Sequence, residues 1–250
     1  EAVIERLDIK QNLYANLDKF RLKDTIVSSN TSTIPMDELI AKSKAPFKKK
    51  FMITHFFNPP RYMRLLELVT KNDTDPEAVE RIRHFCDYRL GKTVVECNDT
   101  PGFIANRIGT YWLHCAVTEA IKQDIDVETA DAVLSKPVGF PRTGVFGLMD
   151  MVGLDLMPHV LSSLSNALDK DDPFHALGDA PKLLEKMIED GYTGRKGKGG
   201  FYRLTKDKTK QALNLNDGSY FDAKRPKVDA AKAGKKGMRD VLTHDSAAGK

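Results

Sequence analysis

The alternation of short apolar segments with helix-like segments in the first 98 residues restricts the fold more than any other feature of the sequence. Strand-like segments are expected at residues 25–28, 51–56, 65–70 and 93–97, and helix-like segments at residues 1–20, 36–43 and 76–90. Strands that are separated by helices of this length are typical of parallel βαβ units. We therefore predict an open α/β sheet for this part of the chain.

Residues 99–203 carry helix signals almost exclusively. The stretch Asp99-Thr-Pro-Gly has a polar capping residue followed closely by proline, and the apolar positions after it recur at helical spacing. A helix is therefore predicted to begin near Pro101. Further helices are predicted at residues 127–135, 147–152, 154–168 and 181–189. The expected fold class is α/β followed by all-α.

Residues 204–250 are rich in lysine and poor in large apolar side chains. A segment of this composition buries little apolar surface, and basic runs of this kind are common in solvated connectors. We predict a basic extension or linker without a core of its own.

The composition excludes several classes of protein. A chain of 250 residues, 41% hydrophobic and 30% charged, is long enough to bury real cores. Its apolar runs fall short of the roughly 18 to 20 residues that span a bilayer, and its first residues lack the layout of a signal peptide, so a cytoplasmic location is expected. A net charge of +4 does not argue for nucleic acid. The three cysteines are well separated and odd in number, so neither a disulfide framework nor a metal site is expected.

An ionisable pair lies inside two segments that otherwise have the composition of buried strands. In THFFNPPRYMRLLELV, residues 54–69, His55 ends one apolar run and Glu67 lies within the next. If the two strands form an antiparallel hairpin that opposes positions 55 and 67, the β-carbons lie within roughly 5 Å. The carboxylate would then accept the imidazole N–H and fix the tautomer of a general base. The alternative is a structural histidine bonded to a backbone carbonyl, with the glutamate in solvent.

Two further stretches carry candidate site residues. The strand near Val27 ends in SNTST, residues 29–33, and open α/β sheets bind ligands at the carboxyl ends of their strands. An ordinary strand-to-helix turn favours the same residue types. Asn106 falls near the start of the first helix of the helical part, where an amide could hold a substrate carbonyl or simply face solvent.

Six stretches of the chain follow one another in a specific order. They are SNTST (29–33), HFFNP (55–59), LLELV (65–69), DTPGFIANR (99–107), GLMDMVGLD (147–155) and GRKGKGGFY (194–202). In this combination the chain resembles the L-3-hydroxyacyl-CoA dehydrogenase family of fatty-acid β-oxidation, over about residues 1–203. The resemblance implies an enzyme that oxidises the 3-hydroxyl group of an acyl-CoA thioester and passes hydride to NAD.

The resemblance also implies roles for single residues in the reaction. His55 matches the family's general base and Glu67 its partner, while Ser29 and Asn106 match hydrogen-bond donors to the substrate's oxygens. Removal of hydride from an alcohol carbon requires the hydroxyl proton to leave at nearly the same time, and a neutral histidine within hydrogen-bond reach can take it.

Cofactor contacts are implied as well. They fall on Glu5, Lys10, Ser29 and Asn58, the first two in the opening EAVIERLDIK and the last in HFFNP. By the same resemblance, residues 1–98 correspond to the C-terminal part of a Rossmann-type NAD-binding domain, 99–203 to the helical substrate and dimerisation domain, and 204–250 to a connector.

One departure from the family pattern is large. The sequence contains no G-x-G-x-x-G turn after a strand, the element on which the cofactor pyrophosphate binds. The opening EAVIE is similar to the end of the fifth strand of such a domain. We therefore expect a fragment that carries the catalytic base but lacks most of the cofactor site, so that the isolated chain would be inactive.

Two other functions stay open. The chain could be a non-catalytic acyl-CoA-binding or dimerisation module derived from the family. It could also belong with β-hydroxyacid dehydrogenases that act on free acids, although those enzymes typically use lysine as the base. The expected partners are an acyl-CoA substrate and a second copy of the chain bound through the helical domain. The lysine-rich tail is similar to the connector of multifunctional proteins in which a hydratase module is fused to the dehydrogenase.

Overall fold

The computed structural model describes residues 1–178 and 181–224. The chain divides into two compact units, Glu1–Ile108 and Gly109–Lys250. Each unit has its own hydrophobic core.

Unit 1 contains the predicted α/β sheet. Its helices are α1 (Leu7–Phe20), α2 (Met36–Leu39), α3 (Ala45–Lys48) and α4 (Pro76–His84), which continues into a π-helix, η1 (Phe85–Arg89). Its strands are β1 (Val27–Ser29), β2 (Phe51–Phe56), β3 (Leu65–Val69) and β4 (Thr93–Cys97), and they lie in this order in the sheet. The pairs β1–β2 and β3–β4 are parallel, whereas β2–β3 is antiparallel.

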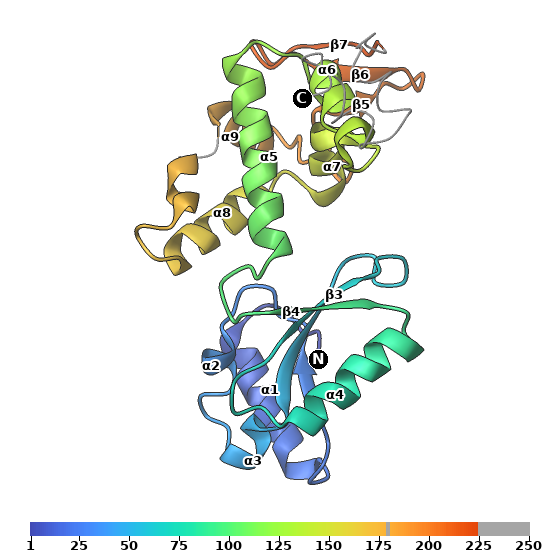
Figure 1. Cartoon of the computed structure of the whole chain (residues 1–250). Helices are drawn as coiled ribbons and strands as arrows, with labels where there is room; N and C mark the ends of the chain where they lie inside the picture. The colour runs from blue at the N-terminus through green and yellow to red at the C-terminus, as the bar shows by residue number, and fades with distance from the viewer. Residues whose placement is uncertain (179–180, 225–250) are drawn as a thin grey trace, which may run out of the picture. The chain divides into compact units, whose positions relative to one another are not determined.

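Both faces of this sheet are covered by helices, which explains why β2 has apolar residues at consecutive positions. Phe51 and Ile53 face the cluster that contains Tyr14 of α1, while Met52 faces the cluster that contains Ala78 of α4. Figure 1 shows these two helices beside the strands of unit 1. Side chains therefore alternate between two half-cores, as the period of a strand requires.

The sheet extends past β1 toward the first residue. The backbone nitrogen of Glu1 donates to the carbonyl of Ser28, and the N–H of Asn30 donates to the carbonyl of Glu1, both at 2.8 Å. This pair of bonds has the pattern of a parallel ladder, in which one residue bonds to the two neighbours of its partner. The side chain of Glu1 is thereby held next to the end of β1.

Unit 2 is mainly helical. It contains most of α5 (Ala105–Lys122), followed by α6 (Val127–Val133), η2 (Lys136–Val138), α7 (Gly144–Val152), α8 (Leu156–Ala167), η3 (Pro173–Leu177) and α9 (Lys182–Glu189). An antiparallel sheet of β5 (Tyr202–Leu204), β6 (Lys210–Leu213) and β7 (Tyr220–Asp222) follows. Among the described residues no single helix is long and apolar enough to cross a bilayer; α7 and α8 reach that length only as a pair bent by 91°.

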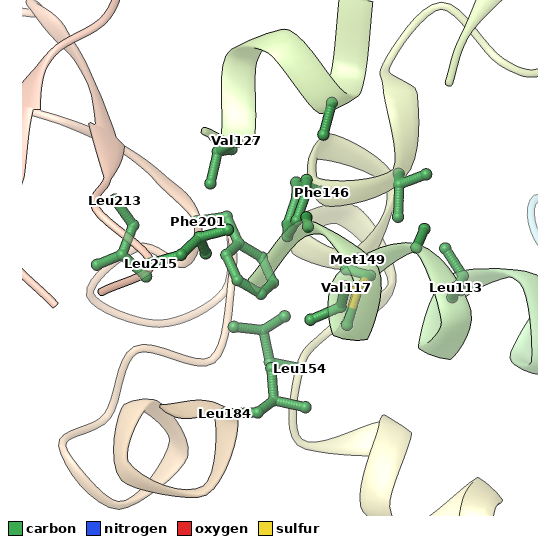
Figure 2. Close-up of a cluster of buried hydrophobic side chains, with 14 of the residues drawn as sticks. Leu113, Val117, Val127, Phe146, Met149, Leu154, Leu184, Phe201, Leu213 and Leu215 are labelled. Atoms are coloured by element: carbon green, nitrogen blue, oxygen red, sulfur yellow. The ribbon is translucent and has the colours of Figure 1, made fainter. Parts of the chain in front are cut away.

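The three-stranded sheet corrects the prediction that a linker begins at residue 204. Leu213 and Leu215 are 2% and 8% exposed and belong to the main core of unit 2. Figure 2 shows them gathered with Phe201 and Val127, near Phe146. Strands of three or four residues in a lysine-rich segment are too short for their apolar positions to form a recognisable pattern. The rest of the predicted extension, residues 225–250, lies outside the described residues.

The start of α5 also differs from the prediction. The helix begins at Ala105 instead of Pro101, because Gly102 and Phe103 have positive φ angles of 75° and 49°, which a right-handed helix does not allow. Asp99, predicted to cap this helix, instead accepts a hydrogen bond from the N–H of Met36 at the start of α2.

Candidate active site

The register of β2 and β3 places His55 directly opposite Glu67. The imidazole Nδ1 and the carboxylate Oε2 are 2.7 Å apart, and the side chains are 9% and 1% exposed. The predicted antiparallel hairpin and its register are therefore confirmed, and the alternative with a solvent-facing glutamate is wrong for this chain.

The second carboxylate oxygen of Glu67 is held by the start of α5. Oε1 accepts the backbone N–H groups of Ile104, at 3.0 Å, and Ala105, at 2.8 Å. The two positive φ angles at Gly102 and Phe103 turn the chain so that these donors point at the carboxylate. Free N–H groups and the positive end of a helix dipole both stabilise a negative charge.

These contacts determine the charge of Glu67. Burial by itself raises the pKa of this carboxyl, but the hydrogen bond from His55, the two backbone N–H bonds and the charge of the imidazole outweigh burial. The pKa of Glu67 is lowered from its ordinary value as a result. At neutral pH the side chain is a carboxylate with a hydrogen-bond donor on each oxygen.

The ionised carboxylate beside Nδ1 determines the tautomer of His55. A carboxylate accepts only, so Nδ1 carries the hydrogen and Nε2 of the neutral ring is the acceptor, as inferred from the hydrogen-bond network. Within the described residues no hydrogen bond to Nε2 is found. The ring is confined by Phe57 and Phe103, whose centroids lie 4.7 and 5.6 Å from its own. The arrangement suits a general base with a fixed tautomer.

Ser29 ends β1 and is fully buried. Its hydroxyl donates to Oε2 of Glu1 at 2.8 Å and accepts the N–H of Thr31 at 3.2 Å. Burial by itself raises the pKa of Glu1, but bonds from Tyr14, Lys10 and Ser29 lower it to about 2, so the acceptor is ionised. The single hydroxyl hydrogen of Ser29 is directed to this carboxylate. In this structure the hydroxyl hydrogen of Ser29 is engaged with Glu1, and its expected role as a donor to substrate stays a prediction.

Lys10 and Glu5 form one network with Glu1. The ammonium of Lys10, 1% exposed, lies 2.9 Å from Oε1 of Glu1 and 3.2 Å from Oε2 of Glu5. The other oxygen of Glu5 accepts from the hydroxyl of Thr31 and from the N–H of Ser32. Glu5 thus binds the turn that follows β1, and Lys10 holds Glu5 in place instead of presenting its charge to solvent.

The remaining two predicted residues lie close in sequence to the histidine pair. Asn58 is exposed and follows the end of β2 by two residues. Asn106 is half-buried and directly follows Ala105, whose N–H binds Glu67. Asn30, which lies in SNTST but was given no role of its own, accepts the N–H of Phe56 at 2.8 Å and so ties the ends of β1 and β2 together.

Sequence reasoning missed two positioning residues, Tyr14 and Lys92. Tyr14 donates to Glu1, and the Nζ of Lys92 donates to the carbonyls of Pro60 and Met63 in the loop after His55. Neither belongs to a motif. The sequence therefore contained no pattern that would single them out.

Comparison with known proteins identifies the family. Residues 1–100 match the family described as "3-hydroxyacyl-CoA dehydrogenase, NAD binding domain", and residues 102–204 match "3-hydroxyacyl-CoA dehydrogenase, C-terminal domain".

Three similar proteins span all or most of the chain. A putative fatty acid oxidation complex trifunctional enzyme of Rickettsia prowazekii is 42% identical, over 100% of this chain and 34% of its own length. A probable 3-hydroxyacyl-CoA dehydrogenase of Bacillus subtilis is 37% identical, over 100% of this chain and 32% of its own. The crystal structure of FadB2 from M. tuberculosis is 32% identical with a TM-score of 0.72, over 82% of this chain and 70% of that one.

The chain spans about a third of the length of those two curated relatives. Its first part is a Rossmann-like α/β unit, its second part is mainly helical, and the two parts match the two domains of one family. This chain belongs to the 3-hydroxyacyl-CoA dehydrogenase family.

Proposed function

We propose that this chain carries the catalytic base of an NAD-dependent dehydrogenase that oxidises (S)-3-hydroxyacyl-CoA to 3-oxoacyl-CoA in fatty-acid β-oxidation. The observation that carries the proposal is the buried hydrogen bond of 2.7 Å between His55 and Glu67, with the second oxygen of Glu67 held by two backbone N–H groups. This arrangement leaves Nε2 of the histidine to accept the proton of the substrate's 3-hydroxyl group.

In the proposed reaction, Nε2 of His55 takes the hydroxyl proton as the hydride leaves the substrate's C3. Glu67 stabilises the imidazolium that forms, because it stays ionised and does not compete for the proton. Asn106, at the start of α5, is proposed to donate its amide hydrogen to the thioester carbonyl. Ser29 is proposed to donate its hydroxyl hydrogen to the substrate's 3-oxygen, which requires that this hydrogen leaves Glu1 when substrate binds.

NAD, when bound, supplies the hydride acceptor. The residues of this chain fit the cofactor in part, since Glu5 and Asn58 are exposed polar groups near the carboxyl ends of the parallel strands β1 and β2. Lys10 and Ser29 are buried and would act on the cofactor through Glu5 and Glu1. Because the 250 residues contain no G-x-G-x-x-G turn, we propose that they provide the catalytic part of the site and only part of the cofactor site.

The partners of the protein are proposed on the same basis. An acyl-CoA is the substrate, and a second copy of the chain is expected to bind through the helical unit, where Tyr111, Met151 and Val152 are exposed. The trifunctional relative supports a multifunctional parent protein. A hydratase module joined to the dehydrogenase is proposed from the family resemblance.

Steady-state oxidation of 3-hydroxybutyryl-CoA, followed by NADH absorbance in the enzyme that carries this sequence, tests the proposal. Glu67→Gln should abolish most of the turnover, because the amide cannot stabilise the imidazolium and presents an N–H group to backbone donors. Glu77→Gln, an exposed position on α4, is the matched control. Equal turnover of the two variants would contradict the role of the pair.

Titration of the 250-residue chain with NADH and then with acetoacetyl-CoA separates the enzyme from the non-catalytic module. The proposal expects that any NADH binding to the chain by itself is unchanged by Glu5→Gln, at the turn after β1. Tight NADH binding that this substitution weakens would show that the cofactor site is more complete than proposed. Thioester binding with no NADH formation in the enzyme that carries the sequence would favour the module.

A further inference from the structure

Unit 2 contains a cavity that the dehydrogenase chemistry does not use. Its volume is about 680 Å³, which is within the range of small-molecule sites in proteins. It is bounded by the loop before α7, by the glycine-rich segment GRKGKGG (194–200) and by the strands β5 and β6. The sequence singled out that glycine-rich segment, and nothing in the proposed mechanism involves it.

Five cationic side chains from four segments line this cavity. They are Arg142, Arg195, Lys198, Arg203 and Lys210. No ion pair joins any of these five to an acidic side chain anywhere in residues 1–178 and 181–224. Like charges gathered around one concave surface repel each other and produce a positive potential that attracts anions.

In the described part of the chain, two carboxylates near the cavity accept hydrogen bonds from other groups and form no ion pair with its cations. Asp150, which also lines it, accepts the N–H groups of Phe201 and Tyr202, both at 2.8 Å, and is 3% exposed. Asp131 lies behind Tyr202 and accepts its hydroxyl at 2.9 Å. These carboxylates hold the wall of the cavity in place and do not neutralise its cations by direct contact.

Two of the cations are held in position by aromatic rings. The Nζ of Lys210 lies 3.6 Å from the centroid of Tyr202, and the guanidinium of Arg203 lies 3.8 Å from the centroid of Tyr220. The Nε of Arg203 also donates to Gln211 at 2.9 Å, which orients the guanidinium plane. Donors that are ordered before a ligand arrives lose less side-chain entropy on binding.

We infer that this cavity is a binding site for a small molecule that carries a diphosphate or a similar cluster of phosphate groups. Guanidinium groups bind phosphate oxygens through paired hydrogen bonds, and lysines add point charges without a geometric requirement. A ligand with two adjacent phosphates presents enough negative charge and enough acceptors to engage several of the five cations together. The inference does not depend on the dehydrogenase activity, because the cavity and His55 belong to different units.

Calorimetric titration of the full 250-residue chain with inorganic pyrophosphate tests this site. We expect saturable binding of one pyrophosphate per chain, which weakens as salt is added because surface charges are screened. Arg142→Gln and Arg195→Gln should each weaken binding about tenfold or more, because each removes a charge-assisted hydrogen bond. Both arginines are exposed and form no ion pair within the described residues, so the variants should keep a melting temperature near that of the wild type. Lys186→Gln, an exposed cation of α9 outside the cavity, is the matched control and should bind as wild type.

Parallel titrations with ADP and with coenzyme A distinguish the sources of the phosphates. Equal affinities for pyrophosphate, ADP and coenzyme A support a site that recognises the diphosphate alone, and tighter binding of coenzyme A supports one that also uses its third phosphate. Sulfate binding as tight as pyrophosphate binding contradicts the inference, as does wild-type affinity in both arginine variants. Absence of saturable pyrophosphate binding, or binding of an oligonucleotide without pyrophosphate, also overturns it.

Discussion

Each unit of this protein buries carboxylates, and the two units treat them in opposite ways. In unit 1, Glu67 is 1% exposed, yet its pKa is lowered from the ordinary value. In unit 2, Asp131 and Asp150 are 9% and 3% exposed, and burial raises the pKa of each to about 6. All three side chains are nearly inaccessible to solvent, so the difference has to be sought also in their hydrogen-bond partners.

The partners explain it. Glu67 has an imidazole on one oxygen and a helix start on the other, and both favour the ionised form. Asp131 and Asp150 are bonded to neutral backbone N–H groups and to the hydroxyl of Tyr202. The charge of Asp131 also raises the pKa of Asp150, and the nearby charges of Lys210 and Arg195 lower the two pKa values too little to offset burial. A buried carboxylate beside a charged partner is suited to chemistry, whereas one held by neutral donors is suited to joining segments of chain.

The largest effect is expected from His55→Gln in the enzyme that carries this sequence. Glutamine keeps a donor toward Glu67 but cannot take a proton from the substrate, so turnover should fall by roughly 10²- to 10⁴-fold. The loss of turnover can be assigned to the missing base only if the variant keeps a melting temperature near that of the wild type. His84→Gln, at an exposed histidine of α4, is the control. Near-normal turnover of His55→Gln would show that Glu67 is only structural.

Opposite pH dependence of local stability should separate the two kinds of carboxylate. The folded pKa of Asp131 and Asp150 lies above the unfolded value of 3.8, so the native state binds more protons between 3.8 and about 6. Their contribution to the free energy of unfolding is fully present below that window and is lost as the pH rises through about 6. For each carboxyl taken alone the loss is roughly 2 to 3 kcal/mol.

For Glu67 the contribution to the free energy of unfolding changes with pH in the opposite direction. Its folded pKa is lowered, so its contribution is present above its ordinary pKa of 4.5 and is lost as the pH falls through the folded value. Amide hydrogen exchange, corrected for the intrinsic rate at each pH, measures both effects. Raising the pH should reduce protection of Phe201 and increase protection of Ala105. If protection changes with pH in the same way at both amides, the two kinds of carboxylate do not differ as proposed.

Asp150→Asn tests whether neutral donors are enough to make a buried carboxylate structural. Each oxygen of Asp150 accepts one backbone N–H, and an amide offers one acceptor while turning its NH₂ group toward the other donor. We expect a loss of about 1 to 3 kcal/mol in the free energy of unfolding at neutral pH. Denaturant unfolding measures it, with the exposed Asp207→Asn as control. No loss would mean that the contact between α7 and β5 does not depend on this side chain.

The smallest effect on stability is expected from substitution of Lys92, a buried cation of unit 1 whose hydrogen-bond partners are neutral. Its ammonium, 7% exposed as a residue, donates to the carbonyls of Pro60 and Met63. Lys92→Met should cost about 1 kcal/mol and speed amide exchange in residues 57–64, because the carbonyls turn to solvent. Lys92→Arg should restore most of the protection. Unchanged exchange in the methionine variant would show that the loop holds its shape without the lysine.

The histidine pair could be predicted because it follows from local patterns. Two strand-like runs with a short connection imply a hairpin, and the period of a strand then sets which residues oppose each other. The spacing of His55 and Glu67 along the chain therefore allowed the pairing, and the family resemblance favoured it over a solvent-facing glutamate. The donors to the second oxygen of Glu67 could not be found in this way, because they depend on where α5 begins. That start was predicted at Pro101 and lies at Ala105.

Unit 2 was harder to predict from sequence. Strands as short as β5 and β7 carry too few residues for a period to show, and their stability comes from packing Phe201 and Leu213 against the helices. The two aspartates gave no signal either. Aspartate is usually exposed, and only the tertiary contacts reveal that these two are buried acceptors.

By itself the sequence determined the order of strands and helices along unit 1 and the family, and it offered the opposition of His55 and Glu67 as one of two alternatives. All of these depend on spacing along the chain. The tertiary structure alone decided the ionisation of the buried carboxylates, the direction in which Ser29 donates, and the gathering of five cations around one cavity. The physical reason is that a charge or a hydrogen bond depends on atoms brought together from distant segments, and no periodic pattern records which segments those will be.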